Sequence, residues 1–246
     1  MKFSTVSKSS TVQGVKCLIY AGSGDGKSVL TATLPAPIMI SAEAGILSLR
    51  RSNLVKIFGP DDPSICYDMP LIEISTVEDL SDAYNWCYSS KEAAGIESVA
   101  LDSITEIAEV VLANAKMLVK DPRQAYGELI DKMEMLVRSF RDLPGKNVAL
   151  LAKMEPQKDE FTGVVKYVPS MPGAKLSNKL PYYFDEVFRL GVGKAPDGTQ
   201  YRFLQTQPDL QYVAKDRSGA LDPIEEPHLG KIFTKIMSES AVSEAA

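Results

Sequence analysis

The segment Ala21-Gly22-Ser23-Gly24-Asp25-Gly26-Lys27-Ser28 follows an apolar run at residues 15–20 and precedes a run typical of a helix. It fits the phosphate-binding pattern G-x-x-x-x-G-K-[ST], with Ala21 in the place of the first glycine. Glycines let successive backbone N–H groups turn toward an anion, and the following helix adds the positive end of its dipole. The alternative, a glycine-rich turn that binds nothing, is disfavoured because both the strand and the helix are present.

The residue types in this loop predict separate contacts with a nucleotide. The Lys27 ammonium would reach the β- and γ-phosphates, and the Ser28 hydroxyl would ligate Mg²⁺. The sequence therefore predicts a nucleoside triphosphate and Mg²⁺ as cofactors. The residues expected to contact the nucleotide are Gly22, Ser23, Gly24, Asp25, Gly26, Lys27, Ser28 and Val29.

The composition limits the class of protein. The chain has 246 residues, of which 45% are hydrophobic, which is enough to bury the core of one α/β domain. The net charge of −5 excludes a wholly basic surface, so any contact with nucleic acid must come from a local patch. Three dispersed cysteines fit a reducing compartment, with Cys17 expected to be buried. The single histidine, His228, excludes a multi-histidine metal site and is interpreted as a surface residue.

The pattern of apolar runs and turn residues predicts α/β alternation. Strands are expected at 15–20, 38–41, 71–74, 98–102, 147–152, 186–190, 200–206 and 212–214. Helices are expected after the glycine-rich loop and at 76–88, 104–119, 124–143 and 229–237, with a surface loop at 54–69 and a hairpin tip at 161–164. Thr76-Val77-Glu78-Asp79 has the form of a capping box that opens the helix at 76–88, and Leu118 is expected on the packed face of the helix at 104–119. This order predicts a mostly parallel sheet flanked by helices, with a C-terminal antiparallel extension.

The expected domain organisation is simple. Residues 1–13 form a polar arm, residues 14–237 form the domain, and residues 238–246 form an acidic tail expected to be disordered. No signal peptide and no membrane-spanning run is visible, so the expected location is the cytoplasm.

Three carboxylates are candidates for chemistry at the nucleotide. Asp102 ends an apolar strand, where a Walker B acid would hold Mg²⁺ together with Ser28, although it also fits a helix cap. Hydrolysis needs a residue that orients water, and Glu43 and Glu106 are the candidates. Glu43 is preferred because it follows the second strand on a small-residue turn, at the sheet edge where ligands bind.

These residues together resemble the RecA ATPase core. In that family the catalytic glutamate closes the second strand, as Glu43 does, and an aspartate followed by serine closes the Walker B strand, as Asp102-Ser103 does. The resemblance covers about residues 12–233. Within that family, residues 180–186 and 214–217 make the chain look most like phage-encoded RecA-like recombination ATPases of the single-strand annealing type. It implies a RecA-like P-loop NTPase core that uses ATP and Mg²⁺, with Lys27 and Glu43 as catalytic residues.

The resemblance also implies partners. RecA-like proteins place two basic residues on a late strand that reach the neighbouring subunit's γ-phosphate, and Lys215 and Arg217 match that spacing; a solvated ion pair is the alternative. The expected assembly is a ring or filament with ATP at subunit interfaces, in the host cytoplasm and with a possible single-stranded DNA-binding protein as partner. The family's polar sensor after the fifth strand is replaced here by Lys153 or Gln157.

The segment after the fifth strand contacts single-stranded DNA in that family. Here it combines lysines with aromatic residues, as backbone contact and base stacking require, although an ordinary lysine-bearing hairpin is the alternative. The expected DNA contacts are Lys158, Phe161, Lys166, Tyr167, Lys175 and Lys179. The expected function is ATP-dependent annealing or strand exchange. The alternative is a nucleotide-gated assembly ATPase that binds no DNA. A kinase is disfavoured because the sequence contains no arginine-rich lid, and a GTPase because it contains no Asn-Lys-x-Asp stretch.

Overall fold

A computed structural model describes residues 14–43 and 46–242 of the chain. Its described part contains a nine-stranded sheet in the order β3-β2-β4-β5-β1-β7-β8-β9, with β6 paired to β5 outside this path. The strands are β1 (Lys16–Ala21), β2 (Pro37–Ser41), β3 (Leu71–Glu73), β4 (Ser98–Asp102), β5 (Asn147–Lys158), β6 (Val165–Pro169), β7 (Glu186–Lys194), β8 (Gln200–Gln205) and β9 (Ile224–Glu225). The helices are α2 (Lys27–Leu30), α3 (Arg51–Phe58), α4 (Val77–Ser89), α5 (Ile104–Leu118), α6 (Pro122–Arg141), α7 (Ala174–Lys179) and α8 (Leu229–Val242).

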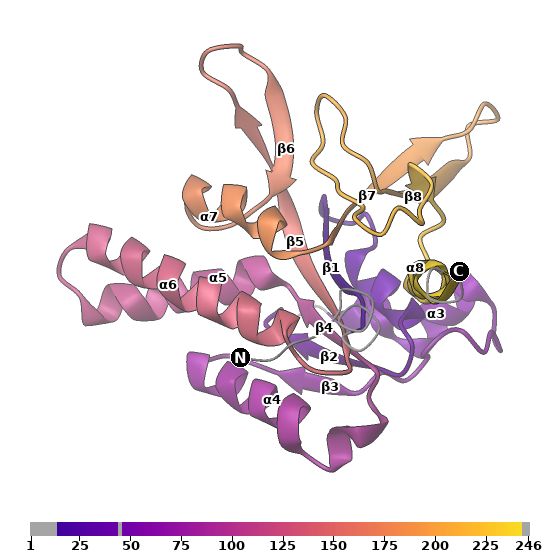
Figure 1. The fold of residues 1–246 in the computed structure, drawn as a ribbon, viewed down its shortest axis with the longest axis horizontal. Coiled ribbons are helices and arrows are strands. Elements are labelled where there is room, and N and C mark those ends of the chain that lie inside the picture. The colour runs from indigo at the N-terminus through magenta and orange to yellow at the C-terminus, as the bar shows by residue number, and fades with distance from the viewer. Residues whose placement is uncertain (1–13, 44–45, 243–246) are drawn as a thin grey trace.

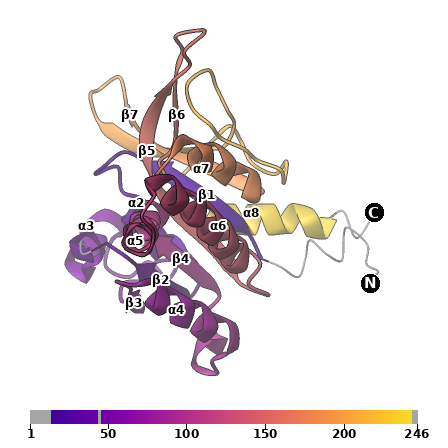
Figure 2. The ribbon, with the colours of Figure 1, turned by 90° about the vertical axis from the view of Figure 1, so that its left-hand side faces the viewer.

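The strands from β3 to β7 in this order pair in parallel, whereas β8, β9 and β6 pair antiparallel. Helices α4, α5 and α6 cover one face of the sheet and α8 covers the other (Figures 1 and 2). The expected fold class, a mostly parallel sheet with a C-terminal antiparallel extension, is therefore confirmed.

Strand β1 shows why the sheet is buried on both faces. Its residues alternate between the two cores, with Leu18 and Tyr20 on the α5–α6 side and Cys17 and Ile19 on the α8 side. None of these four side chains is exposed, as predicted for Cys17. Each fully buried leucine or isoleucine contributes about 1.5–3 kcal/mol, so the strand that leads into the glycine-rich loop is firmly anchored.

Several helix boundaries follow local signals. Thr76 accepts from the Asp79 N–H and Asp79 accepts from the Thr76 N–H, so the expected capping box opens α4. Ser103 caps α5 and Asp121 caps α6, with Pro122 in the first turn. Helix α4 also carries the single tryptophan, Trp86, which packs at the edge of the α5–α6 core.

The structure corrects five expectations. Helix α3 occupies the first part of the expected loop at 54–69, and residues 212–214 make only isolated bridges instead of a strand. Strand β5 continues to Lys158 because β6 pairs with its second half. His228 is buried, with its Nε2 2.9 Å from the Ser64 hydroxyl, and Leu118, expected on the packed face of its helix, is exposed.

The chain ends also differ in part from expectation. Helix α8 runs to Val242, into the segment expected to be a disordered tail. Residues 1–13 and 243–246 lie outside the described residues, so the expected arm and the end of the tail stay predictions. In the part of the chain that is described, no helix combines the length and the apolar character needed to cross a membrane.

Candidate active site

The glycine-rich loop joins β1 to α2 in a conformation that needs glycine. Gly24 and Gly26 have φ angles of 82° and 105°, values that residues with a Cβ rarely adopt. The Asp25 carboxylate accepts from the Gly22 N–H at 2.8 Å, and the Arg202 Nε of β8 donates to the Asp25 carbonyl at 2.6 Å. The loop is therefore held by a hydrogen bond within it and by a second one from β8.

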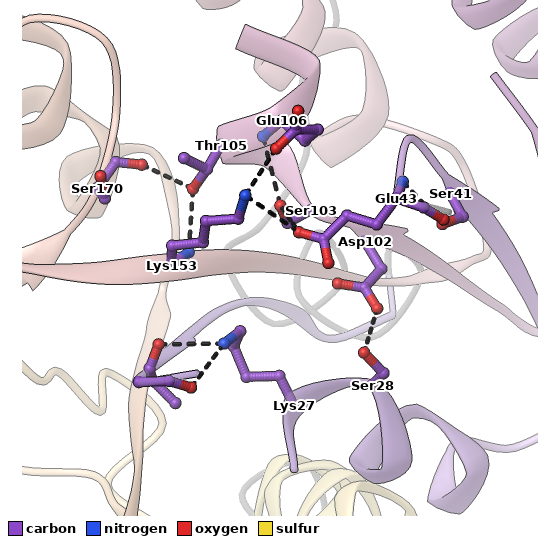
Figure 3. Close-up of polar contacts among 12 residues, drawn as sticks. Lys27, Ser28, Ser41, Glu43, Asp102, Ser103, Thr105, Glu106, Lys153 and Ser170 are labelled. Carbon is purple, nitrogen blue, oxygen red and sulfur yellow. Dashed lines mark hydrogen bonds and ion pairs between the residues drawn. The ribbon is translucent and has the colours of Figure 1, made fainter. Parts of the chain in front are cut away.

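The Lys27 ammonium folds back over the loop. It donates to the carbonyls of Ala21 and Gly22 at 3.1 and 3.0 Å (Figure 3). Burial lowers the pKa of Lys27, while the carboxylates of Asp102 and Glu43 act in the opposite direction. A partly buried cation held by only two carbonyl oxygens is ready to accept a phosphate as a further partner.

Asp102 ends β4 and faces Ser28 across one intervening strand, β5. The Ser28 hydroxyl donates to its carboxylate at 2.5 Å. Only 4% of Asp102 is exposed. Burial raises the pKa of Asp102, and the hydrogen bond from Ser28 partly offsets that rise. A hydroxyl and a carboxylate side by side are oxygen ligands of the kind that Mg²⁺ prefers.

Glu43 lies beside this pair, just past the end of β2. Its Oε1 accepts a hydrogen bond from the Ser103 hydroxyl at 2.7 Å and lies 3.6 Å from the Lys153 ammonium. Figure 3 shows Lys153 between Glu43 and Glu106, and the Glu106 carboxylate lies 2.6 Å from the same ammonium. The hydrogen bond from Lys153 to Glu106 raises the pKa of Lys153. Ala44 and Gly45, which follow Glu43, lie outside the described residues.

Lys153 is fixed by the backbone around it. Its Cα pairs with Ala21 of β1, so the residue lies at the same sheet edge as the glycine-rich loop. Its N–H donates to the Thr105 hydroxyl at 3.0 Å, and that hydroxyl donates to the Ser170 carbonyl at 2.7 Å. The Ser170 N–H in turn donates a hydrogen bond to the Lys153 carbonyl at 2.6 Å. This ring of bonds ties the nucleotide edge of the sheet to the base of the β5–β6 hairpin.

One cleft of about 750 Å³, a volume typical of small-molecule sites, is lined by Lys27, Ser28, Glu43, Asp102, Lys153 and Arg202 among others. The backbone of Gly24 borders open space, because a Cβ there would meet nothing within 4 Å. A cation, glycine N–H groups, a hydroxyl and a buried carboxylate fit a nucleoside triphosphate with Mg²⁺. Mg²⁺ in such sites needs only one or two protein ligands, which Ser28 and Asp102 could supply.

A family model described as an AAA domain (AAA_24) matches residues 13–218. The chain belongs to this family. With its glycine-rich loop and mostly parallel sheet, this AAA domain is a nucleotide-binding P-loop ATPase. No curated protein matches it significantly.

Two solved structures are distantly similar to this AAA domain. One is a KaiC-like protein, PH0186, from Pyrococcus horikoshii OT3, with 13% identity, a TM-score of 0.43, and coverage of 80% of this chain and 82% of the other. The second is the flagellar accessory protein FlaH from Methanocaldococcus jannaschii, with 10% identity, a TM-score of 0.43, and coverage of 83% and 84%.

The structure gathers most of the predicted site residues of the AAA domain. Ser23, Gly24, Gly26, Lys27, Ser28, Val29, Glu43 and Asp102 line the cleft, while Gly22 and Asp25 support the loop from behind. Sequence reasoning missed Ser103 and Arg202. Ser103 had a usable signal in its place after Asp102, whereas nothing in the sequence points to Arg202.

Lys215 and Arg217 lie outside the lining of their own subunit's cleft. The Lys215 ammonium donates to the Pro181 carbonyl at 2.8 Å, and Arg217 pairs with Asp185 at 3.1 Å. Tyr20, at the end of β1, is fully buried and donates to the Val213 carbonyl at 2.7 Å. The alternation of β1 directs this side chain into the core.

The residues expected to contact DNA follow the hairpin and α7. Phe161 is fully exposed at the tip, and Lys158 and Lys166 line a hollow of about 540 Å³ together with Tyr182 and Lys215. Tyr167 stacks on Tyr212 with ring centroids 5.0 Å apart, and Lys179 pairs with Glu134. Lys175 is exposed on α7. The hairpin stands out from the end of the sheet (Figures 1 and 2).

Proposed function

We propose that this AAA domain hydrolyses ATP with Mg²⁺ at the cleft beside Lys27, and that it couples this reaction to single-stranded DNA. The DNA step would be annealing or strand exchange in phage homologous recombination. The observation that carries the proposal is the meeting of Ser28, Asp102 and Glu43 at one sheet edge.

The geometry supports a distinct task for each residue. Lys27 would give up its carbonyl partners for the phosphates, and Ser28 and Asp102 would hold the metal. When bound, Mg²⁺ neutralises phosphate charge. Oε1 of Glu43 is taken by Ser103 and Lys153, while no hydrogen bond within the described residues reaches its Oε2. That second oxygen would orient a water molecule and accept its proton.

Assembly is part of the proposal. Lys215 and Arg217 lie away from their own cleft on a partly exposed turn, where they could reach a neighbouring subunit. A cation supplied by a neighbouring subunit would stabilise charge in the transition state. Subunits would then associate head to tail, which produces a ring or a filament.

The hairpin supports the DNA step. Strand β5 runs without interruption from the core to Lys158, and Lys153 of the same strand lies in the nucleotide cleft. Lysines for phosphates and exposed aromatic faces for bases meet the needs of single-strand binding. Because β5 carries both Lys153 and Lys158, nucleotide binding in the cleft and binding of single-stranded DNA to the hairpin would influence each other.

The deciding experiment measures ATP hydrolysis by the purified protein with and without single-stranded DNA. We expect Mg²⁺-dependent turnover that DNA stimulates, and a loss of about 10²- to 10⁴-fold in Glu43→Gln, the range for removal of a general base. Glu73→Gln is the matched control, since Glu73 ends β3 opposite Ser41 but does not line the cleft.

Binding of a labelled single strand, followed by fluorescence anisotropy, separates the two rival functions. Turnover that ignores DNA, together with no binding of the strand, would replace the recombination proposal with a nucleotide-gated assembly ATPase. Turnover that survives intact in Glu43→Gln would remove Glu43 from the reaction.

A further inference from the structure

Glu186, the first residue of β7, is a buried carboxyl in the sheet interior. Only 3% of it is exposed, and its Cα pairs with Cys17 of β1. None of the ion pairs among the described residues involves Glu186, and its Oε2 has no hydrogen-bond partner there. An ionised carboxylate in such a place would be costly.

A second carboxyl, Asp216, builds the turn above it. Its Oδ1 accepts from the Ser218 N–H at 2.8 Å and from the Ser218 hydroxyl at 2.6 Å, and its Oδ2 accepts from the Leu221 N–H at 3.2 Å. The Oε1 of Glu186 accepts from the same Ser218 N–H at 3.2 Å. Oxygens of both carboxyl groups therefore converge on one nitrogen.

Two carboxyl groups this close do not both ionise readily. Burial, followed by the charge of Asp216, raises the pKa of Glu186 to about 8. Burial also acts on Asp216, but the hydrogen bonds from Ser218, Leu221 and Gly219 outweigh it and lower the pKa of Asp216. The other titratable groups that face Glu186 are the Cys17 thiol of β1 and the Lys215 ammonium, which is engaged with Pro181. Glu186 thus carries the proton, and Asp216 carries the charge.

The turn built by Asp216 carries Lys215 and Arg217, the two cations proposed to act at a neighbouring subunit. Lys215 is bound to Val187 by two backbone hydrogen bonds of 2.8 and 2.9 Å, and Arg217 follows on the far side of Asp216. We propose that Glu186 is a positioning residue: its protonated carboxyl and the Asp216 carboxylate, which converge on the Ser218 N–H, lock the turn that presents Lys215 and Arg217. The functional half of this inference rests on the proposed role of these cations at a neighbouring subunit.

The proton makes the lock sensitive to pH. Because the pKa of Glu186 is higher in the closed turn than its ordinary value of 4.5, the closed form binds more protons than the open form. The lock is therefore complete at low pH, weakens as the pH rises from about 4.5, and is lost as the pH passes about 8. Gln at this position keeps the volume and a donor but does not ionise.

The test is limited trypsin cleavage after Lys215 and Arg217 in the nucleotide-free protein. The pH is varied from about 5.5 to about 8.5, a range that contains the expected opening of the turn. Cleavage after Lys158 and Lys166 of the same molecule corrects for the enzyme's own pH dependence. In the wild type we expect the corrected cleavage to rise by about tenfold per pH unit up to about pH 7.5, if the open turn exposes Glu186 to water. Glu186→Gln should show a flat and low profile.

Equal profiles in the wild type and Glu186→Gln would overturn the proposal. If Glu186→Gln does not fold, the ¹³C chemical shift of the Glu186 carboxyl in the wild type decides instead: titration near 8 supports the lock and titration near 4.5 overturns it. A second measurement follows ATPase activity against pH, which should fall with the lock in the wild type but not in Glu186→Gln. Complete lack of ATPase activity beside a pH-dependent turn would defeat the proposed function and leave the lock standing.

Discussion

The nucleotide cleft and the β5–β6 hairpin share one strand but differ in how their charges are used. In the cleft, Lys27 and Asp102 are each held by hydrogen bonds from within the subunit. On the hairpin, Lys158 and Lys166 form none of the ion pairs seen among the described residues, and Phe161 is fully exposed. The cleft is preorganised for a small ligand, whereas the hairpin presents charge to a partner from outside.

The comparison is tested most severely by Lys27→Ala. We expect nucleotide affinity to fall about a thousandfold, or ~4 kcal/mol, because a partly buried cation opposite the phosphates is lost. Isothermal titration with a non-hydrolysable ATP analogue measures this change. Lys146→Ala is the matched control, since Lys146 also caps two backbone carbonyls, those of Ala93 and Ile96, away from the cleft. Normal affinity in Lys27→Ala would refute the assignment of the loop.

Arg217→Ala tests whether the cleft is completed from outside. Turnover of the assembled protein should fall roughly a hundredfold, the loss seen when one stabilising donor is removed from a transition state. Nucleotide affinity of the separate subunit should not change, because Arg217 does not line its own cleft. Mixing Arg217→Ala with Glu43→Gln subunits should restore part of the activity, since each supplies what the other lacks. No rescue on mixing would argue against a site shared between subunits.

The double variant Lys158→Ala/Lys166→Ala tests the hairpin alone. Affinity for a single strand should fall about twentyfold at moderate salt, and the slope of log K against log salt should become shallower by about 1.4. Anisotropy titrations at several salt concentrations measure both values. Lys179→Ala should have a smaller effect, because its ammonium is paired with Glu134. An unchanged salt slope would exclude the hairpin lysines as phosphate contacts.

Ser103→Ala gives the smallest expected effect and the finest test of the cleft. Loss of its hydrogen bond to Glu43 should lower kcat roughly fivefold, or about 1 kcal/mol, without a change in nucleotide affinity. Ser103 also caps α5, so Thr76→Ala, which removes the cap of α4, controls for lost stability. If both variants lower kcat equally, Ser103 does not act through Glu43.

Local signals explain which parts of the molecule were predictable. The glycine-rich loop, the capping box at Thr76 and the end of β4 at Asp102 each depend on residues adjacent in sequence. Their positions were correct for that reason. The position of Glu43 beside Asp102 was also predictable, because Glu43 follows the end of its strand and the carboxyl ends of parallel strands meet at one edge of a sheet.

Contacts between distant segments explain the rest. The second half of β5 is a strand only because β6 folds back on it, and His228 is buried only because the loop with Ser64 covers it. The place of Lys153 between Glu43 and Glu106 depends on the register of β5 against β1. No local sequence pattern determines that register. The sequence therefore pointed to Lys153 but not to its ion pairs with Glu43 and Glu106.

The position of Trp86 has a practical consequence for spectroscopy. It is the single tryptophan of the chain, it packs against the core on α4, and its indole N–H lies 3.4 Å from Glu92. No residue of α4 lines the nucleotide cleft or the hollow at the hairpin. We therefore expect the intrinsic fluorescence of Trp86 to report global unfolding rather than ligand binding, so every variant above can be checked for integrity in the same cuvette as its binding assay.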